Sequence, residues 1–282
     1  MRTSPREFAR DGRQEGRIPA PGQRSALTKV WETRWLLLRW TQRDFTVQYR
    51  QSLLGVVWAL AQPLLLLVFY GFVFKGVLRI NAPRGSYLVF ALCGLAPWTF
   101  LSSVLNRSAS SLIGATTVVR QVYFPRSIIP LAATGVTMID LGLATVVLLA
   151  AQLATAGTIH LSTLALVPIY LGLVLLMAGI SVFVALVGAL VRDIRFVIPL
   201  AVQVGFIATP VMYPRSLVPH RYAWVYDLNP VARTIEAVRV SVIDGRWPSL
   251  GVLLGPLAVG LVVLAVALCY SASVEDRLPD LL

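Results

Sequence analysis

Long stretches of the chain carry no charged residue, and this feature constrains the fold most. Residues 53–74, 87–105 and 161–191 contain no Asp, Glu, Lys or Arg. An α-helix needs about 20 apolar residues to cross the hydrocarbon core of a membrane. Only 13% of all residues are charged, whereas soluble proteins carry about 25%. The sequence therefore predicts an all-α integral membrane protein.

The apolar stretches predict about six transmembrane helices within residues 53–272. Their expected positions are 53–74, 87–106, 128–152, within 163–191, 196–213 and 250–271. Asp140 is the only acid in a predicted span. It either faces a central pathway and binds a polar substrate or an Arg, or forms a hydrogen bond between packed helices, with Thr134 or Thr137 as partner.

The distribution of Lys and Arg predicts how the helices are oriented. With these spans, 17 of the 25 basic residues lie on one side of the membrane, 11 of them before residue 53, and 8 lie on the other side. Because cytoplasmic loops collect basic residues, both termini are predicted to be cytoplasmic. Residues 1–26, rich in Arg, Gly and Pro, are expected to form a disordered tail, and residues 273–282 a second cytosolic tail.

A segment before the first span has a different pattern. Within residues 27–45, apolar residues recur at helical spacing and alternate with charged ones; the apolar ones are Leu27, Val30, Trp31, Trp35 and Leu38. This pattern predicts an amphipathic helix that lies on the cytoplasmic face, as a simple anchor or as an interface with a partner.

The residues needed for several kinds of chemistry are missing. The two histidines, His160 and His220, fall in outer loops, and no paired carboxylates, metal-ligand cluster or Ser/His/Asp set is visible. Neither of the two lysines, Lys29 and Lys75, follows a glycine, so the chain has no P-loop for a nucleotide. We expect no catalytic residue, no metal and no cofactor in this chain. The net charge of +12 is explained by basic cytoplasmic segments rather than by nucleic-acid binding.

Two short cytoplasmic segments combine arginines with aromatic residues. They are residues 119–127, between spans two and three, and residues 192–196, between spans four and five. Exposed aromatic side chains beside Arg are typical of protein–protein anchors. The alternative is that both are solvated loops that follow the positive-inside rule.

The outer side shows two further patterns. Within residues 214–249, Asn229 is suited to cap a helix that Pro230 begins, and the whole segment is predicted to form a re-entrant or interfacial helical hairpin. Aromatic residues gather at the outer ends of the spans, and Trp98 lies deeper. They form either an interfacial belt or a pathway lined with rings.

Several short motifs, in their order and spacing, resemble those of a known family. They are Arg43-Asp44-Phe45, the stretch from Tyr49 to Gly55, Trp58, Pro63, Arg192-Asp193-Ile194, and Leu228-Asn229-Pro230 with Glu236. Over about residues 28–275 the chain resembles the permease subunit of ABC exporters for cell-envelope polysaccharides, such as O-antigen, capsule and teichoic-acid exporters.

The resemblance implies a function and partners. It implies a homodimer in the bacterial inner membrane, paired with two ATP-binding-cassette subunits that hold ATP and magnesium. The substrate would be a polysaccharide on a polyprenyl pyrophosphate lipid. The alternatives are a drug or small-lipid exporter of the same superfamily, a membrane-bound glycosyl- or acyltransferase, and a scaffold subunit. A transferase would need a catalytic His or Asp pair within the membrane, which the sequence lacks.

The resemblance also suggests roles for particular residues. Contact with the ATPase would involve Arg120, Tyr123, Phe124, Arg126, Arg192 and Asp193. The lipid pyrophosphate would be neutralised where it enters by Arg39, Arg43 and Arg50. The glycan channel would be lined by Tyr70, Phe74, Tyr87, Phe90 and Trp98. The outer gate would contain Asn229, Pro230 and Glu236.

Overall fold

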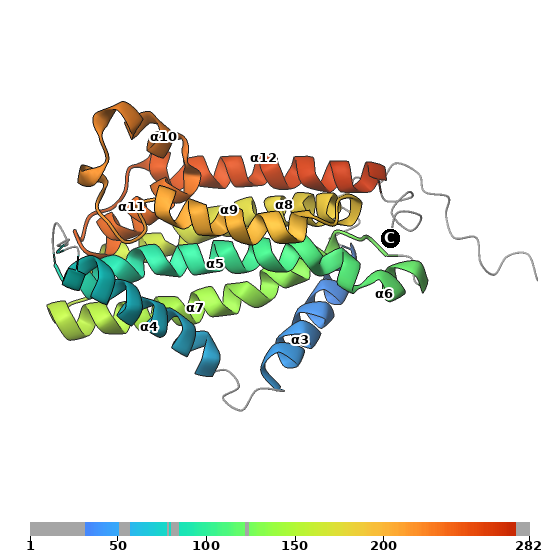
Figure 1. Cartoon of the computed structure of the whole chain (residues 1–282), viewed down its shortest axis with the longest axis horizontal. Helices are drawn as coiled ribbons and strands as arrows, with labels where there is room; N and C mark the ends of the chain where they lie inside the picture. The colour runs from blue at the N-terminus through green and yellow to red at the C-terminus, as the bar shows by residue number, and fades with distance from the viewer. Residues whose placement is uncertain (1–31, 51–56, 78, 80–84, 122–123, 275–282) are drawn as a thin grey trace, which may run out of the picture.

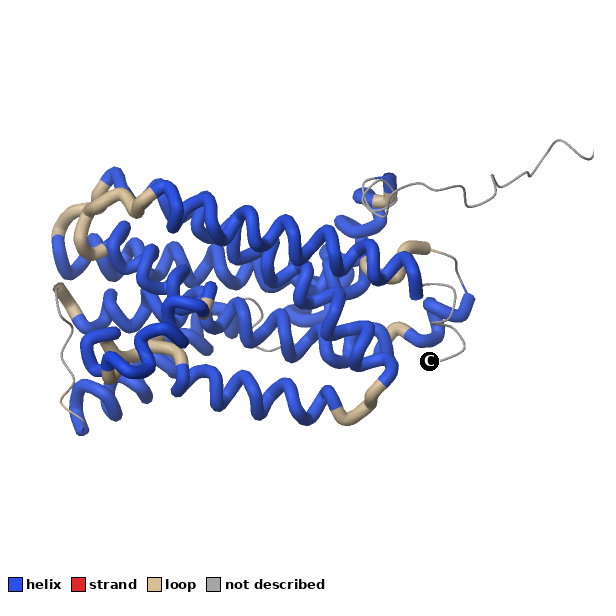
Figure 2. The backbone as a smooth tube through the Cα atoms, turned by 90° about the horizontal axis from the view of Figure 1, so that it is seen from above, coloured by secondary structure: helices blue, strands red, loops and turns tan. Residues whose placement is uncertain are grey.

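The computed structural model describes residues 32–50, 57–77, 79, 85–121 and 124–274. Every regular element in this part of the chain is helical (Figures 1 and 2). The α-helices are α3 (Arg34–Arg50), α4 (Val57–Gly71), α5 (Tyr87–Gly114), α6 (Thr116–Gln121), α7 (Ile128–Ala156), α8 (Leu166–Leu190), α9 (Ile194–Ala208), α10 (Ala223–Leu228), α11 (Pro230–Val242) and α12 (Leu250–Val274). Shorter elements are a π-helix, η1 (Phe72–Val77), and three 3₁₀ helices, η2 (Leu161–Ala165), η3 (Arg215–Leu217) and η4 (His220–Tyr222).

Four of the described helices are long and apolar enough to cross a membrane. They are α5, α7, the continuous stretch Leu161–Leu190 that contains α8, and α12. The predicted first and fifth spans correspond to shorter helices, α4, which continues into η1, and α9, each of 15 residues. The all-helical membrane fold is thus confirmed, whereas six full spans stay a prediction.

Helix α5 lies at the centre of the bundle. It packs against α4, α7, α8, α9 and α11 (Figure 1). From Val89 to Trp98 every residue is buried. A helix that is apolar on all sides can be buried on all sides, which explains why this run forms the core.

A seam of glycines joins α8 to α12. A Cβ atom on Gly179 would lie 2.7 Å from the backbone nitrogen of Leu264, and one on Gly260 would lie 2.8 Å from that of Leu176. Small residues let two membrane helices approach until their backbones touch. The close fit of α8 and α12 therefore depends on the absence of side chains at these positions.

The amphipathic helix is present but differs in its bounds. Helix α3 begins at Arg34 and extends to Arg50, past the predicted end at residue 45, and residues 27–31 lie outside the described residues. Leu36, Leu37 and Trp40 pack against the bundle, whereas Trp35 and Leu38 are exposed. Some apolar side chains of this helix therefore pack against the bundle, and others are exposed on its surface. The predicted tail of residues 1–26 also lies outside the described residues, and α12 includes the first two residues of the predicted C-terminal tail.

The two proposed partners of Asp140 bind elsewhere. The Thr137 hydroxyl donates to the backbone oxygen of Thr134 at 2.8 Å, and the Thr134 hydroxyl donates to that of Pro130 at 3.1 Å. Each hydroxyl has one proton, so neither is left to donate to Asp140. The prediction that these threonines hold Asp140 is wrong.

The glycine seam leads to a prediction about stability. Substituting Gly179→Ala should destabilise the bundle by about 1–3 kcal/mol, because the new methyl group would force α8 and α12 apart. Substituting Gly142→Ala in α7, where a Cβ atom meets nothing within 4 Å, should leave stability unchanged or raise it slightly. Thermal unfolding of the detergent-purified variants measures the difference, and equal midpoints would contradict the seam.

Candidate functional site

An aromatic groove of about 430 Å³ lies between α4 with η1, α5 and α9. Its rings come from Phe69 and Tyr70 on α4, Phe74 on η1, Trp98 on α5 and Phe206 on α9. The ring centroids of Tyr70 and Phe206 are 4.7 Å apart, and Trp98 meets Phe206 edge-on at 5.7 Å. These are the usual distances of interacting aromatic pairs, so the groove has a wall of connected rings.

A line of polar side chains faces the same groove. Thr99, Ser102 and Asn106 follow one another on α5 at intervals of three and four residues, and Gln203 adds an amide from α9. The three α5 side chains donate to carbonyls of their own helix, such as Asn106 Nδ2 to the Ser102 oxygen at 2.8 Å. Their oxygen lone pairs therefore stay available to a ligand in the groove.

The structure brings together three of the five residues predicted to line the channel. Tyr70, Phe74 and Trp98 line this groove, whereas Tyr87 and Phe90 do not. Those two are buried at the end of the bundle that is predicted to face outwards and is called the outer end below. The sequence analysis missed Phe206, because it did not identify a second aromatic wall on the fifth apolar helix. No signal in the sequence marked it, because its ring meets that of Tyr70 across two segments far apart in the chain.

At the outer end, Arg239 on α11 is buried and holds three segments together. Its Nη2 donates to the Val211 oxygen at 2.7 Å, its guanidinium lies 3.7 Å from the centre of the Phe90 ring, and it is only 5% exposed. Its Nη1 lies 3.9 Å from the Glu236 carboxylate. Through these contacts the buried arginine connects α11 to α5 and to the chain that follows α9.

The same short segment after α9 is fixed at three more points. The Tyr87 hydroxyl donates to the Met212 oxygen at 3.0 Å. A Cβ atom on Gly94 would lie 2.2 Å from the Val211 oxygen, so only glycine permits this approach of α5. Asn229 Nδ2 donates to Thr209 Oγ1 at 3.3 Å. Residues 209–212 are therefore a rigid junction between α9 and the outer hairpin.

The predicted start of the helix at Pro230 is confirmed, whereas its role as an outer gate stays a prediction. Asn229 caps α11, accepting from the backbone nitrogens of Val231 and Ala232, and Pro230 is its first residue. Glu236, the third proposed gate residue, is half exposed beside Arg239. Helix α11 is mostly buried, packed against α5, α8 and α12, while α10 extends from the bundle (Figure 1).

At the opposite end, part of the predicted coupling segment is buried. Phe124 is 7% and Arg126 6% exposed, although the sequence analysis expected exposed aromatics and arginines here. The reason is that α3 covers the segment, with the Trp40 ring 5.9 Å from that of Phe124. Tyr123 lies outside the described residues, as does the side chain of Arg120. Arg192 and Asp193 are exposed in the turn between α8 and α9.

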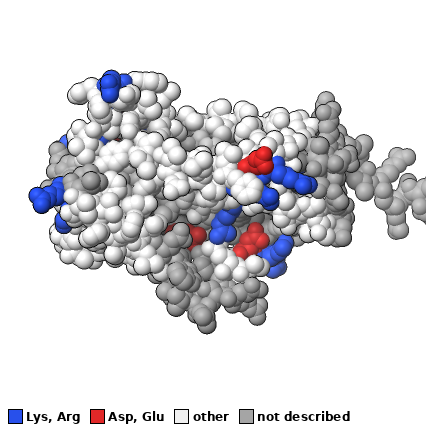
Figure 3. All heavy atoms as spheres, in the orientation of Figure 1, with Lys and Arg blue, Asp and Glu red and all other residues white. Residues whose placement is uncertain are grey.

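Charged side chains also gather beside α3. Arg39 and Arg43, one turn apart on α3, are exposed, while the side chain of Arg50 lies outside the described residues. Burial raises the pKa of the Asp44 carboxyl, and the charges of Arg43 and Arg107 oppose this rise. Arg107 on α5 therefore joins this cluster, which the sequence analysis did not foresee. On the face in Figure 3, charges form one group towards this end, and few lie at the other.

The sequence of the chain is similar to those of known membrane transport proteins. A family model for ABC-2 type transporters matches residues 36–243. The O-antigen export system permease protein RfbA of Klebsiella pneumoniae is 32% identical over 212 residues, which are 74% of this chain and 81% of that protein. RfbA of Myxococcus xanthus is 26% identical over 85% of this chain and 92% of its own length. The polysialic acid transport protein KpsM of Escherichia coli is 27% identical over 84% and 92%.

The contacts of Arg239 predict a large effect on stability. Substituting Arg239→Gln should lower stability by about 2–3 kcal/mol, because the buried Val211 carbonyl would lose a charged donor and Phe90 its cation. Arg233→Gln is the matched control, since Arg233 lies on the same helix but is exposed. Thermal unfolding in detergent compares the two, and an equal loss in both variants would contradict the assigned contacts.

Proposed function

Because the chain belongs to the ABC-2 type transporter family, we propose that it is the transmembrane subunit of an ATP-driven exporter of polysaccharide. The polymer would be linked to polyprenyl pyrophosphate and would move from the cytoplasm across the inner membrane. The observation that carries the proposal is the similarity, over most of the chain, to permeases named for O-antigen export. A relative named for polysialic acid transport supports the same class of substrate.

The aromatic groove supports a polyhydroxylated substrate. Rings such as Tyr70, Trp98 and Phe206 offer flat apolar faces for sugar rings, and Thr99, Ser102 and Gln203 offer hydrogen-bonding groups beside them. A drug or small-lipid exporter of the same superfamily is the alternative. Such an exporter would need only a few polar groups to orient its ligand, whereas a sugar polymer offers hydroxyl groups to every member of this line.

A second copy of the chain would complete the conduit. None of the residues of α9, all of which are described, is buried, and Val68 and Phe69 of α4 are also exposed. The groove lies between these two helices. A homodimer with α4 and α9 at its interface would cover these apolar surfaces and close two grooves into one channel.

The charged cluster beside α3 would bind the pyrophosphate of the lipid. Arg39 and Arg43 project from α3, and Arg107 lies close enough to affect Asp44. Arginines bind phosphate oxygens through charge-assisted hydrogen bonds. Asn106, which precedes Arg107 on α5, lines the groove, so the cluster adjoins the pathway proposed for the glycan.

ATP-binding subunits, which would also hold the magnesium, would act through the turn between α8 and α9. Arg192 and Asp193 are exposed there, and α9 begins directly after them at Ile194. A displacement of this turn would therefore move α9 and with it Val202, Gln203 and Phe206 of the groove. In this proposal the bundle hydrolyses nothing and is driven from the cytoplasmic side.

Export of polymer should depend on the rings of the groove. The double substitution Tyr70→Ala and Phe206→Ala should reduce surface polymer at least about tenfold, because two stacking platforms are lost. Phe183→Ala, which removes an exposed ring of α8 outside the groove, should export normally. Surface polymer is measured by immunostaining of cells that contain equal amounts of each protein. Normal export by the double variant would reject the groove, and unchanged export after deletion of the gene would reject the function.

Coupling should depend on the exposed turn. Exchanging its charges with Arg192→Glu and Asp193→Lys should weaken co-purification of the ATP-binding subunit, because its contacts would meet the wrong charges. Arg221→Glu reverses an exposed charge in the outer hairpin and should leave the complex intact. Pull-down of the ATP-binding subunit measures both variants, and full recovery with the exchanged charges would exclude this turn as the contact.

A further inference from the structure

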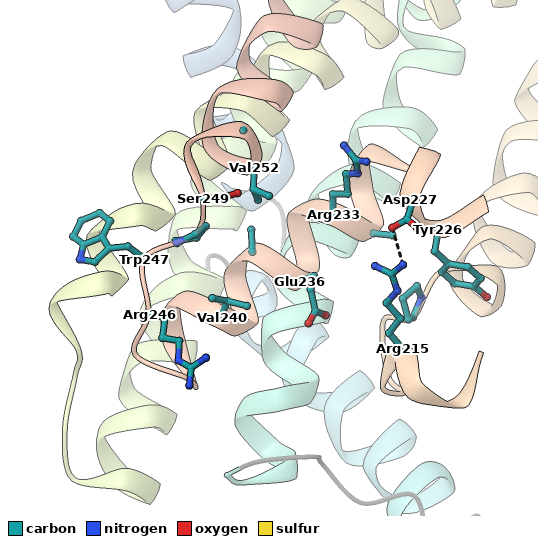
Figure 4. A pocket seen from close by; sticks show the side chains of 15 residues that line it. Arg215, Tyr226, Asp227, Arg233, Glu236, Val240, Arg246, Trp247, Ser249 and Val252 are labelled. Carbon is teal, nitrogen blue, oxygen red and sulfur yellow. Dashed lines mark hydrogen bonds and ion pairs between the residues drawn. The ribbon is translucent and has the colours of Figure 1, made fainter. Parts of the chain in front are cut away.

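A second hollow, of about 590 Å³, lies at the outer end of the bundle, between α10, α11 and the first turn of α12 (Figure 4). Its charged lining consists of Arg215, Asp227, Arg233, Glu236 and Arg246. It shares no residue with the aromatic groove. The hollow therefore offers a separate place for a ligand.

The charges of this hollow do not cancel. Asp227 is paired with Arg215 at 2.7 Å, and Glu236 lies 3.9 Å from the buried Arg239. Each acid thus has its own arginine. Arg233 and Arg246 have no acidic partner among the described residues. The three arginines and two acids of the lining leave the hollow with one net positive charge, which favours an anion.

Arg233 and Arg246 lie on different sides of the hollow. Figure 4 shows Glu236 and Val240 between Arg233, on α11, and Arg246, in the segment that leads to α12. Both side chains are exposed, so they remain hydrated and can turn towards a ligand. Each arginine would attract an anionic group that enters the hollow, and the half-exposed Glu236 carboxylate between them would oppose part of this attraction.

The position along the chain places this hollow at the level of lipid headgroups. Arg246 and Trp247 directly precede α12, a candidate span, and Trp247 is 56% exposed. Arginine and tryptophan at the ends of a span are typical of the membrane–water interface. The anion that this site meets is therefore a component of the membrane surface.

An apolar surface continues from the hollow along α12. Leu250, Leu254 and Leu261 are exposed and lie on one face of the helix. Gly251 and Val252, on the first turn, line the hollow itself. A molecule with its charged head in the hollow would lay its acyl chains against these leucines.

We propose that this hollow binds the phosphate headgroup of an outer-leaflet phospholipid, held by Arg233 and Arg246, with the acyl chains along α12. The occupant is a phospholipid rather than the exported lipid, because the hollow and the proposed conduit share no residue. This inference does not depend on which polymer is exported.

Retention of phosphatidylglycerol by the full chain tests the site. The chain is purified in a neutral detergent, titrated with phosphatidylglycerol and analysed by native mass spectrometry. Arg233→Gln and Arg246→Gln should each weaken binding about fivefold, and the double variant about 25-fold, since one basic residue near a membrane surface contributes this much to the attraction of an anionic lipid. Lysine at both positions keeps the charges and should retain the affinity of the parent within about twofold.

The controls separate this site from general charge and from other phosphates. Arg221→Gln removes an exposed outer arginine that lies over Tyr222 and does not line the hollow, and it should bind as the parent does. Diacylglycerol, which lacks the phosphate, should not be retained, and inorganic pyrophosphate should not displace the lipid. Parent-like affinity in the double Gln variant, equal loss in Arg221→Gln, retention of diacylglycerol, or displacement by pyrophosphate would each overturn the proposal.

Discussion

Backbone groups at membrane depth must find their hydrogen-bond partners within the protein. Helices meet this demand by themselves, and most of the described chain is helical for that reason. Between the end of α9 and the outer hairpin the chain has no regular structure, so its backbone groups need other partners. There the carbonyls of Val211 and Met212 are satisfied by Arg239 and Tyr87. The arrangement of α5, α11 and the outer hairpin follows from these two contacts.

This junction fixes the end of α9 that leads into the outer hairpin. Around Arg239 and Gly94 the helices touch closely, and the residues are buried. Towards the opposite end, Arg192 and Asp193 lie exposed in the turn before α9, and α9 itself has no buried residue. The groove lies between these regions, with one wall on the central α5 and another on the loosely packed α9. A pathway built in this way has a stable side and a movable side.

The apolar runs were sufficient to predict the helices, because charge-free stretches of this length have few alternatives in a membrane. The cap at Asn229 and the amphipathic helix were predictable from local rules. The burial of Phe124 was not, since it depends on α3 lying across the bundle, a contact between distant segments. For the same reason the sequence could not separate Tyr70 and Trp98, which meet in the groove, from Tyr87 and Phe90, which belong to the junction. Phe206 and Arg107 became visible only when the helices were placed side by side.

The glycine seam between α8 and α12 limits how a transport cycle can proceed. Where two backbones touch, neither helix can slide or roll without atoms of one entering the other, because packed interfaces do not deform continuously. The two helices must therefore travel as one body. Any opening of the bundle must therefore occur where helices are less closely packed, which is around α4 and α9. The seam thus makes α8 and α12 one rigid part of the molecule, against which α4 and α9 would move.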